Sequence, residues 1–422
     1  MDTSFARRKS LMGQKSISRF GRAGIIAALA AALAVAPLAC SNGGDDTDSG
    51  AQFNQGPAFN STVWSIAPAG DGSGGVYVGG DFTEYNGTAV TRVARLNSNG
   101  TVDTAFATGT GFNKTVYSIV PVGDGTGDVY VGGAFTSYNG RPANDFVRLH
   151  ADGTIDTNFV TGAGFNNLVR SIALAGDGTG DLYVGGAFTN YNGIPANDLI
   201  RLHVGGLADL TFPTDPGFTN TVLSIVPVGD GSGQLYVAGA FSTYKGTSAP
   251  GIVRLNASAT VDQAFVTGTG FNDAVYKVMP AGDGTGKLYV GGAFTSYKGT
   301  TTKNLVRLTA NGTFDPSFVT GTGFDNTVFS IALPGDGSED LYVGGSFTRY
   351  NGTPANDAVR LNANGTVDPA FITGAGFNNT VLSIVPVGDG SGDIYVGGEF
   401  TQYQGIPIGR FVRLTSAGSL IR

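Results

Sequence analysis

The segment VYVGGAFT at residues 129–136 decides the fold of this chain, because close copies of it return at a fixed spacing. Its tyrosine recurs every 53 residues, without insertion or deletion, at Tyr77, Tyr130, Tyr183, Tyr236, Tyr289, Tyr342 and Tyr395. A fixed period of this length is typical of units that bury their faces by stacking on one another. Seven copies cover residues 52–422 without remainder, so we expect a closed ring rather than an open stack.

Each copy has the pattern of four short strands joined by turns rich in glycine. In the second copy the apolar segment 116–122 is followed by the turn GDGTGD, and then by predicted strands at 129–136, 146–150 and 154–160. Short apolar segments bounded by Gly, Asn and Asp are typical of antiparallel sheets. Seven four-stranded units predict an all-β protein, a seven-bladed β-propeller with short, protected sheet edges. An elongated β-solenoid is the structural alternative.

The last copy stops within its fourth strand, which suggests how the ring closes. Gln52 and Phe53 are in phase with the two positions that would come next. We therefore expect the N-terminal segment to dock on the last blade, with Phe53 filling the missing phenylalanine position.

Composition and charge limit the classes of partner. The chain has 68 glycines, 17 prolines and 41% hydrophobic residues, which indicates many tight turns between strands rather than disorder. The first 39 residues hold six of the 25 basic residues and one of the 32 acids, so the remainder carries a net charge of −12. An acidic body with few lysines lacks the basic surface that grips phosphates, and we expect no nucleic-acid partner.

The N-terminus has the features of an export segment. A basic region ends at Arg22 and is followed by an apolar run over 23–39, which is short for a permanent membrane span. The only cysteine, Cys40, follows Ala39, and this arrangement resembles the lipobox of bacterial lipoproteins, in which the cysteine is acylated. The resemblance implies a lipoprotein signal peptide at 1–39, an acylated Cys40 with a flexible tether at 40–51, and a propeller at 52–422.

Two details leave the export prediction open. Pro37 stands where lipoboxes usually have an aliphatic residue, and Met12 is a possible alternative start. An ordinary secretory leader with an incidental cysteine would give a secreted protein. By analogy with Gram-negative sorting, Ser41 favours the outer membrane, so we expect a cell-surface monomer that contacts the membrane through its lipid alone.

The repeat also resembles known families. The segment VYVGG is similar to kelch repeats, and the fuller pattern YVGG-x-F-T-x-Y-x-G, followed by R-L, a turn, D and F, resembles the delta-60 repeat of bacterial surface proteins. The GDG[ST]G turn is longer than is common in that family. The resemblance covers residues 52–422 and implies a propeller exported to the bacterial surface, without assigned catalytic residues.

Most residues that recur in every copy are predicted to be structural. The series that begin with Tyr77, Tyr85, Phe53, Phe59 and Phe82 are expected to pack between blades, although the Tyr85 series lies in a polar loop and offers an alternative as sugar-stacking platforms. An arginine recurs at each position equivalent to Arg95, and six copies have an aspartate eight residues later, as at Asp103. An arginine and a carboxylate at this spacing predict a structural ion pair across a turn. In the seventh copy Ile421 replaces the aspartate, and the terminal carboxylate of Arg422 is a possible substitute.

The glycine-rich turns suggest a second interpretation, calcium binding as in integrin-like propellers. Oxygen-bearing side chains alternate in four copies, and the candidate ligands are Asp124, Asp128, Asp177, Asp181, Asp336, Asp340, Asp389 and Asp393. Three copies have Gly75, Gln234 and Lys287 at the last position, and no copy has the carboxylate set of a strong calcium loop. We therefore expect no cofactor and retain calcium as an alternative.

The sequence offers no asymmetric catalytic grouping. The two histidines, His150 and His203, occupy one repeat position where other copies have Asn or Thr, so a polar role beside the turn is expected rather than a metal pair. No Ser, His and acid stand apart from the repeat. The sequence therefore predicts a protein that is not an enzyme.

Two positions vary while their neighbours stay fixed, and these are the candidate ligand-binding residues. The first series is Trp64, Tyr117, Arg170, Leu223, Tyr276, Phe329 and Leu382. Aromatic residues and arginine are enriched at binding hot spots. The second variation places Asp81 and Glu399 in the first and seventh copies, where the other copies have Ala or Ser.

Together these features predict a bacterial cell-surface lipoprotein whose propeller is a binding or adhesion scaffold for a protein or glycan. A polysaccharide lyase or hydrolase that uses Asp81 and Glu399, and a calcium-dependent propeller, are the alternatives.

Overall fold

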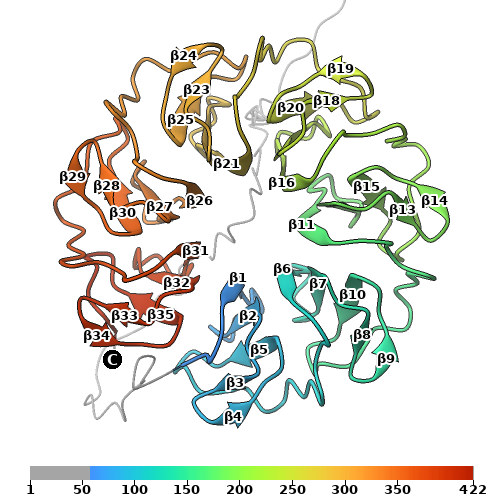
Figure 1. Ribbon diagram of the computed structural model, residues 1–422. Helices are drawn as coiled ribbons and strands as arrows, with labels where there is room; N and C mark the ends of the chain where they lie inside the picture. The colour runs from blue at the N-terminus through green and yellow to red at the C-terminus, as the bar shows by residue number, and fades with distance from the viewer. Residues whose placement is uncertain (1–57, 422) are drawn as a thin grey trace, which may run out of the picture.

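A computed structural model describes residues 58–421, which form a ring of seven blades around a central axis (Figure 1). In the first blade, strands β1 (Val63–Pro68), β2 (Val76–Gly80) and β5 (Val93–Leu96) form an antiparallel sheet in the order β1-β2-β5. A two-stranded hairpin of β3 (Glu84–Tyr85) and β4 (Thr88–Ala89) lies outside it. Residues 58–421 contain no helix with the length and apolar character needed to cross a bilayer.

The other six blades repeat this arrangement. The innermost strands are β6 (Val116–Pro121), β11 (Val169–Leu174), β16 (Val222–Pro227), β21 (Val275–Pro280), β26 (Val328–Ala332) and β31 (Val381–Pro386). The second strands are β7 (Val129–Gly133), β12 (Leu182–Gly186), β17 (Leu235–Gly239), β22 (Leu288–Gly292), β27 (Leu341–Gly345) and β32 (Ile394–Gly398). The third strands are β10 (Phe146–Leu149), β15 (Leu199–Leu202), β20 (Ile252–Leu255), β25 (Leu305–Leu308), β30 (Ala358–Leu361) and β35 (Phe411–Leu414). The hairpins are β8–β9 (Ser137–Tyr138, Arg141–Pro142), β13–β14 (Asn190–Tyr191, Ile194–Pro195), β18–β19 (Thr243–Tyr244, Thr247–Ser248), β23–β24 (Ser296–Tyr297, Thr300–Thr301), β28–β29 (Arg349–Tyr350, Thr353–Pro354) and β33–β34 (Gln402–Tyr403, Ile406–Pro407).

The seven-bladed propeller is confirmed, with a fourth strand that is shorter than expected. In the first blade it is one bridge, Leu96 to Val102, flanked by hydrogen bonds between the backbones of Asn97 and Thr101 and of Asp103 and Arg95. The Asp103 carboxylate then accepts a hydrogen bond from the backbone N–H of Ala105 at 3.0 Å. A side chain that bonds the backbone two residues ahead turns the chain, and this ends the strand.

Neighbouring blades touch through a glycine. A Cβ atom on Gly132 of β7 would lie 2.4 Å from Val169 Cγ1 and 3.1 Å from Ile172 Cδ1 of β11 in the next blade. The equivalent glycines of five other blades face the equivalent valine and isoleucine at similar distances: Gly79, Gly185, Gly291, Gly344 and Gly397. Both aliphatic residues are buried. The missing side chain therefore lets each innermost strand lie directly against the preceding blade.

One junction departs from this rule in a compensated way. The fourth blade has Ala238 at the glycine position, and the residue that faces it in the fifth blade is Val278 instead of isoleucine. Valine lacks the Cδ1 atom that would lie near the added methyl at the other junctions, so one of the two close contacts is relieved, while the contact with the retained Val275 remains. The two changes together conserve the packed volume, which is the kind of exchange that a core tolerates best.

The ring closes between the first and seventh blades through the same contacts as the other junctions. A Cβ on Gly397 would lie 2.5 Å from Val63 Cγ1, and the backbone N–H of Phe59 donates to the Gly409 carbonyl at 2.9 Å. The side chain of Arg410 also donates to the Phe59 carbonyl at 3.2 Å. Closure is therefore a property of the described blades, whereas the predicted role of Phe53 lies outside the described residues.

Three buried aspartates precede third strands. Asp145, Asp198 and Asp357 have left-handed backbone conformations, with φ of 62°, 69° and 68°, and burial raises the pKa of each carboxyl to about 7. The fifth blade has Asn304 at this position, and its side-chain amide donates to the Gly292 carbonyl at 2.9 Å. A protonated carboxyl offers a comparable donor, so the fold favours the neutral acid.

The compensated junction gives a first prediction. Gly132→Ala is expected to lower the free energy of unfolding by about 2 kcal/mol because it overpacks the junction, and Ile172→Val by about 1 kcal/mol because it removes a buried methylene. The double variant should be more stable than Gly132→Ala alone, since it recreates the Ala238–Val278 pair. Urea unfolding of the four proteins measures the coupling, and strictly additive losses would contradict this account of the junction.

The buried aspartates give a second prediction, on pH. In the unfolded chain these carboxyls ionise near pH 4, whereas in the folded protein they stay protonated up to about pH 7. The native state therefore binds more protons in this window, and its stability falls as the pH rises. Replacing all three by Asn should make the protein more stable than the wild type at pH 8, with a smaller difference at pH 5. Urea titrations at the two pH values measure this, and a difference that does not change with pH would refute it.

Candidate functional site

The variable position on the innermost strands is set apart by a β-bulge. In the first blade Val63 pairs with Gly80 and Ser65 pairs with Gly79, so Trp64 is the extra residue between them. The irregularity occurs at the same place in all seven blades. A bulge re-aims the side chain that it carries. Val63 and Ile66 are buried against the seventh blade, while Trp64 stays half-buried.

Residues at this position surround the axis, because their strands are the innermost elements of the ring (Figure 1). We call this set the axial ring, and it comprises Trp64, Tyr117, Arg170, Leu223, Tyr276, Phe329 and Leu382. All seven side chains are half-buried. They lie near the first residue of each innermost strand, and we call the corresponding face of the propeller the start face.

Neighbouring members of the axial ring contact one another. The rings of Trp64 and Tyr117 pack edge to face with centroids 5.4 Å apart, and the Arg170 guanidinium lies 3.7 Å from the centroid of Tyr117. Across the axis, Tyr276 and Phe329 pack edge to face at 4.9 Å. The structure thus brings the five candidate residues of this series together as two continuous groups of side chains.

The second candidate pair flanks the same face. Asp81 directly follows β2, and its carboxylate accepts hydrogen bonds from Trp64 Nε1 at 2.9 Å and from the Thr115 hydroxyl. Glu399 follows β32 at the equivalent place and is half-buried. The two acids therefore lie on adjacent blades at the start face. The contacts of Asp81 show that it fixes the orientation of the indole.

Sequence reasoning missed one residue beside the axial ring. Lys277 follows Tyr276 on β21, where the other six blades have serine. Four of these serines, including Ser65 and Ser171, accept a hydrogen bond from a backbone N–H of the next blade. The exchange of serine for lysine was visible in the repeat alignment, and it would have identified Lys277 as a candidate.

The structure contradicts the suggestion that the Tyr85 series forms sugar-stacking platforms. All seven tyrosines are buried. The Tyr85 ring packs on Phe59 at 4.6 Å, and its hydroxyl donates to the Gly100 carbonyl at 2.8 Å. The side chains of these tyrosines point into the blade, because this orientation buries the ring and also gives the hydroxyl a hydrogen-bond partner.

The predicted arginine–aspartate pairs form in the six copies that have both residues. Their nitrogen–oxygen distances lie between 2.7 Å for Arg307–Asp315 and 3.4 Å for Arg201–Asp209. Arg413 of the seventh copy pairs with Asp389 and Asp393 of its own turn. The suggested substitute at Arg422 lies outside the described residues.

The calcium candidates have arginine partners as well. Asp177 and Asp181 pair with Arg201, Asp336 and Asp340 pair with Arg360, and Asp124 and Asp128 lie 4.0 Å and 3.0 Å from Arg148. The other oxygen of Asp124 accepts hydrogen bonds from Thr126. A guanidinium thus occupies the place that a cation would take, which favours the structural interpretation of these turns.

Each histidine lies between two aspartates that are already paired. His150 Nδ1 is 3.1 Å from Asp128, and its Nε2 is 3.7 Å from Asp156. Both carboxylates also contact Arg148, and His203 has the same surroundings in the third blade. One histidine and two aspartates are ligand types that could bind a metal ion. The neighbouring arginine, however, already pairs with both aspartates, which favours an ion-pair network at this place.

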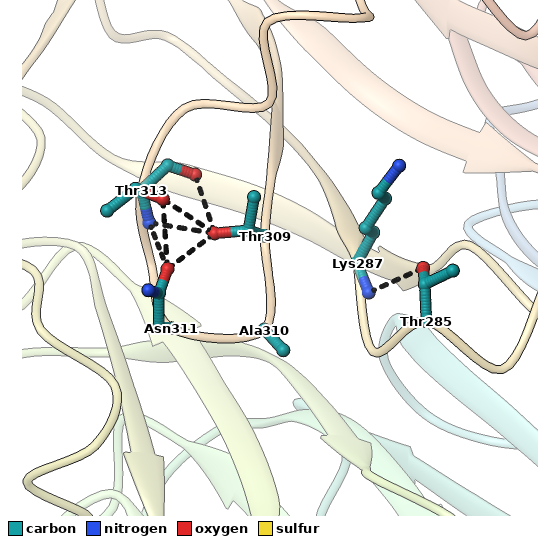
Figure 2. Close-up of a pocket in the computed structure, with 6 residues that line it drawn as sticks. All are labelled: Thr285, Lys287, Thr309, Ala310, Asn311 and Thr313. Atoms are coloured by element: carbon teal, nitrogen blue, oxygen red, sulfur yellow. Dashed lines mark hydrogen bonds between the residues drawn. The ribbon is translucent and has the colours of Figure 1, made fainter.

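A shallow depression of about 410 Å³ lies at the opposite face of the fifth blade, lined by Thr285, Lys287, Thr309, Ala310, Asn311 and Thr313. Figure 2 shows Thr309, Asn311 and Thr313 turned toward one another. The Thr309 hydroxyl donates to Asn311 Oδ1 at 2.5 Å, and a hydrogen bond of 2.7 Å joins it to the Thr313 hydroxyl. Lys287 pairs with Asp315 at 3.1 Å. These polar groups already satisfy one another, so the depression offers less to a ligand than the axial ring does.

The fold and the axial ring define a β-propeller with a chemically varied face at its axis. A family model described as "Domain of unknown function (DUF5122) beta-propeller" matches more than half of the chain, in seven segments: 73–106, 125–159, 178–212, 231–265, 284–318, 340–371 and 390–420. The chain belongs to this family. The match confirms the predicted repeat propeller, while the delta-60 resemblance and the export segment stay predictions.

Two solved structures are similar to this chain at low identity. The Niastella koreensis GH74 enzyme is similar with a TM-score of 0.50 and 15% identity, over 82% of this chain and 52% of that one. The WD40 beta propeller domain of Doa1 has a TM-score of 0.47 and 15% identity, over 83% and 96% of the two chains. Such identities concern the fold alone. No curated protein matches this sequence.

Proposed function

We propose that this chain is a bacterial cell-surface lipoprotein whose propeller binds a protein or glycan ligand through the axial ring. The observation that carries the binding proposal is the contact series Trp64–Tyr117–Arg170, opposite the pair Tyr276–Phe329. These are the large side chains that the repeat leaves free to vary, and they gather at one place. Half-buried aromatic and arginine side chains in contact are the usual anchors of a binding surface.

Asp81 has a positioning role in this proposal. Its two carboxylate oxygens accept hydrogen bonds from Trp64 and Thr115, and this fixes the indole before a ligand arrives. Because both oxygens of Asp81 are engaged in this way, this acid is better suited to orientation than to proton transfer, which favours a binding role over catalysis by Asp81 and Glu399.

The proposed cell-surface location rests on the segment 1–39 and Cys40, which lie outside the described residues. Mass spectrometry of the protein extracted from the membranes of its source should show a chain that begins at Cys40 and carries acyl groups. A mature chain with an unmodified cysteine, or with cleavage elsewhere, would contradict the anchor and leave the binding proposal in place.

The axial ring contains the only tryptophan of the chain, which provides a direct test. Candidate ligands from arrays of bacterial and host glycans and of surface proteins should change the fluorescence of Trp64 on binding. Tyr117→Leu and Tyr276→Leu place at these positions the residue found in the fourth and seventh blades, and each should weaken binding at least tenfold. The exposed Leu210 lies outside the ring, and its exchange for Thr, as in the first two blades, is the matched control. Binding that persists equally in all three variants would refute the axial site.

A further inference from the structure

The innermost strands carry charge at only two positions. Across the seven strands the charged residues are Arg170 of β11 and Lys277 of β21, and both are cationic. Among the acids of the start face that vary between copies, Asp273 lies shortly before β21 and Asp325 shortly before β26, and neither forms an ion pair with these cations. Two others, Asp81 and Glu399, belong to the first and seventh blades. Because the two cations lie on the third and fifth blades, they are on the far side of the ring from this pair (Figure 1).

Neither cation has a carboxylate partner among residues 58–421. All seven arginines of the Arg95 series in the same region do have one. Arg170 contacts the face of Tyr117, which leaves the edge of its guanidinium available to an acceptor. Lys277 makes no hydrogen bond or ion pair with the described part of the chain.

The surroundings of Lys277 do not compensate its charge. The adjacent innermost strands β16 and β26 contain no titratable residue. The second strands β17 and β22 contribute Tyr236 and Tyr289, whose hydroxyls accept hydrogen bonds from Arg254 and Arg307. Protein groups crowd the amine, while the residue as a whole is half-buried. This burial lowers the pKa of Lys277, since a cation removed from water without a partner is destabilised.

An anionic group would remove this imbalance. A carboxylate beside Lys277 would supply the missing partner and favour the charged amine. The two oxygens of a second carboxylate would suit the planar guanidinium of Arg170. The remainder of the chain beyond the leader has a net charge of −12, which disfavours long polyanions. Tyr117 against Arg170, and Tyr276 beside Lys277 in the chain, favour a ligand with partly apolar C–H faces, as sugar rings have.

We propose that Lys277 and Arg170 bind the carboxylates of a short acidic glycan, an oligosaccharide of uronic acid units, at the axial ring. This inference rests on the proposed function and names the ligand class of the same site. The axial aromatic residues contact the sugar faces, and the two cations select the charged form over neutral sugars. An acidic peptide shares the carboxylate but lacks the sugar faces.

The test uses three probes on the full chain: oligogalacturonate, its methyl ester and a tetraglutamate peptide. Binding is followed through Trp64 fluorescence and by calorimetry. We expect the free acid to bind at least tenfold more tightly than the ester and the peptide. Lys277→Ser and Arg170→Leu introduce residues that other blades already have at these positions, so both variants should fold. Each should reduce the preference for acid over ester at least fivefold. The matched control is Lys298→Asn, which removes an outer lysine where four other blades have Asn.

Proton uptake gives an independent readout. Because a bound carboxylate favours the charged form of the amine, calorimetry in buffers of different ionisation enthalpy, over a pH series that spans the titration of the amine, should show more protons taken up by the wild type than by Lys277→Ser. Equal binding of acid and ester, unchanged in both variants, would overturn the role of the two cations. Tighter binding of tetraglutamate would overturn the glycan class in favour of a peptide. The proposed function fails separately, if Tyr117→Leu and Tyr276→Leu leave the binding of an identified ligand unchanged.

Discussion

The close approach of each blade to the next is the constraint on which the rest of the structure depends. A glycine on the second strand lets the valine and isoleucine of the following innermost strand lie against the backbone, as at Gly132 with Val169 and Ile172. This contact fixes the position of the innermost strand. The β-bulge after the valine of each innermost strand then turns the next side chain, such as Trp64, toward the axis. The axial ring therefore results from the packing rule that builds the propeller.

Additional links between blades are polar, and they use the same repeat. Arg307 pairs with Asp315 in its own blade and also donates to the Ala363 carbonyl of the next one at 2.8 Å. Ser65 accepts a hydrogen bond from the backbone of Ile119 in the second blade. A buried arginine and a buried hydroxyl each need a full set of partners, so these residues hold the blades in one relative orientation. In the fifth blade, Lys277 replaces this serine, so an inter-blade hydrogen bond is lost and an unpaired charge takes its place.

Much of the fold could be predicted from the sequence, because a period repeated seven times averages out the uncertainty of any single copy. The blade number, the burial of the Phe59 and Phe82 series and the arginine–aspartate pairs follow from the repeat. The length of the fourth strand does not, since it depends on a side-chain hydrogen bond of Asp103 that competes with the ladder. The burial of Tyr85 was also open, because a polar loop gives no sign that its tyrosine turns inward to reach a carbonyl.

The candidate site was predictable in composition but not in geometry. The variation at Trp64 and its equivalents marked a position outside the shared core. That Trp64, Tyr117 and Arg170 would touch depended on the bulge, which the sequence pattern does not reveal. The hydrogen bond between Asp81 and the indole of its own blade was likewise not visible in the sequence pattern.

The junction between the first and seventh blades has a consequence for how the molecule is made. It is the one place in the described ring where neighbouring blades are not consecutive in the chain, yet its contacts equal those of the other junctions. Until the seventh blade is complete, an emerging chain presents an aliphatic face at Val63 and a glycine face on its latest blade. These two faces are complementary on every copy of the molecule. Completion of the last repeat therefore decides whether the first blade finds its partner face in its own chain.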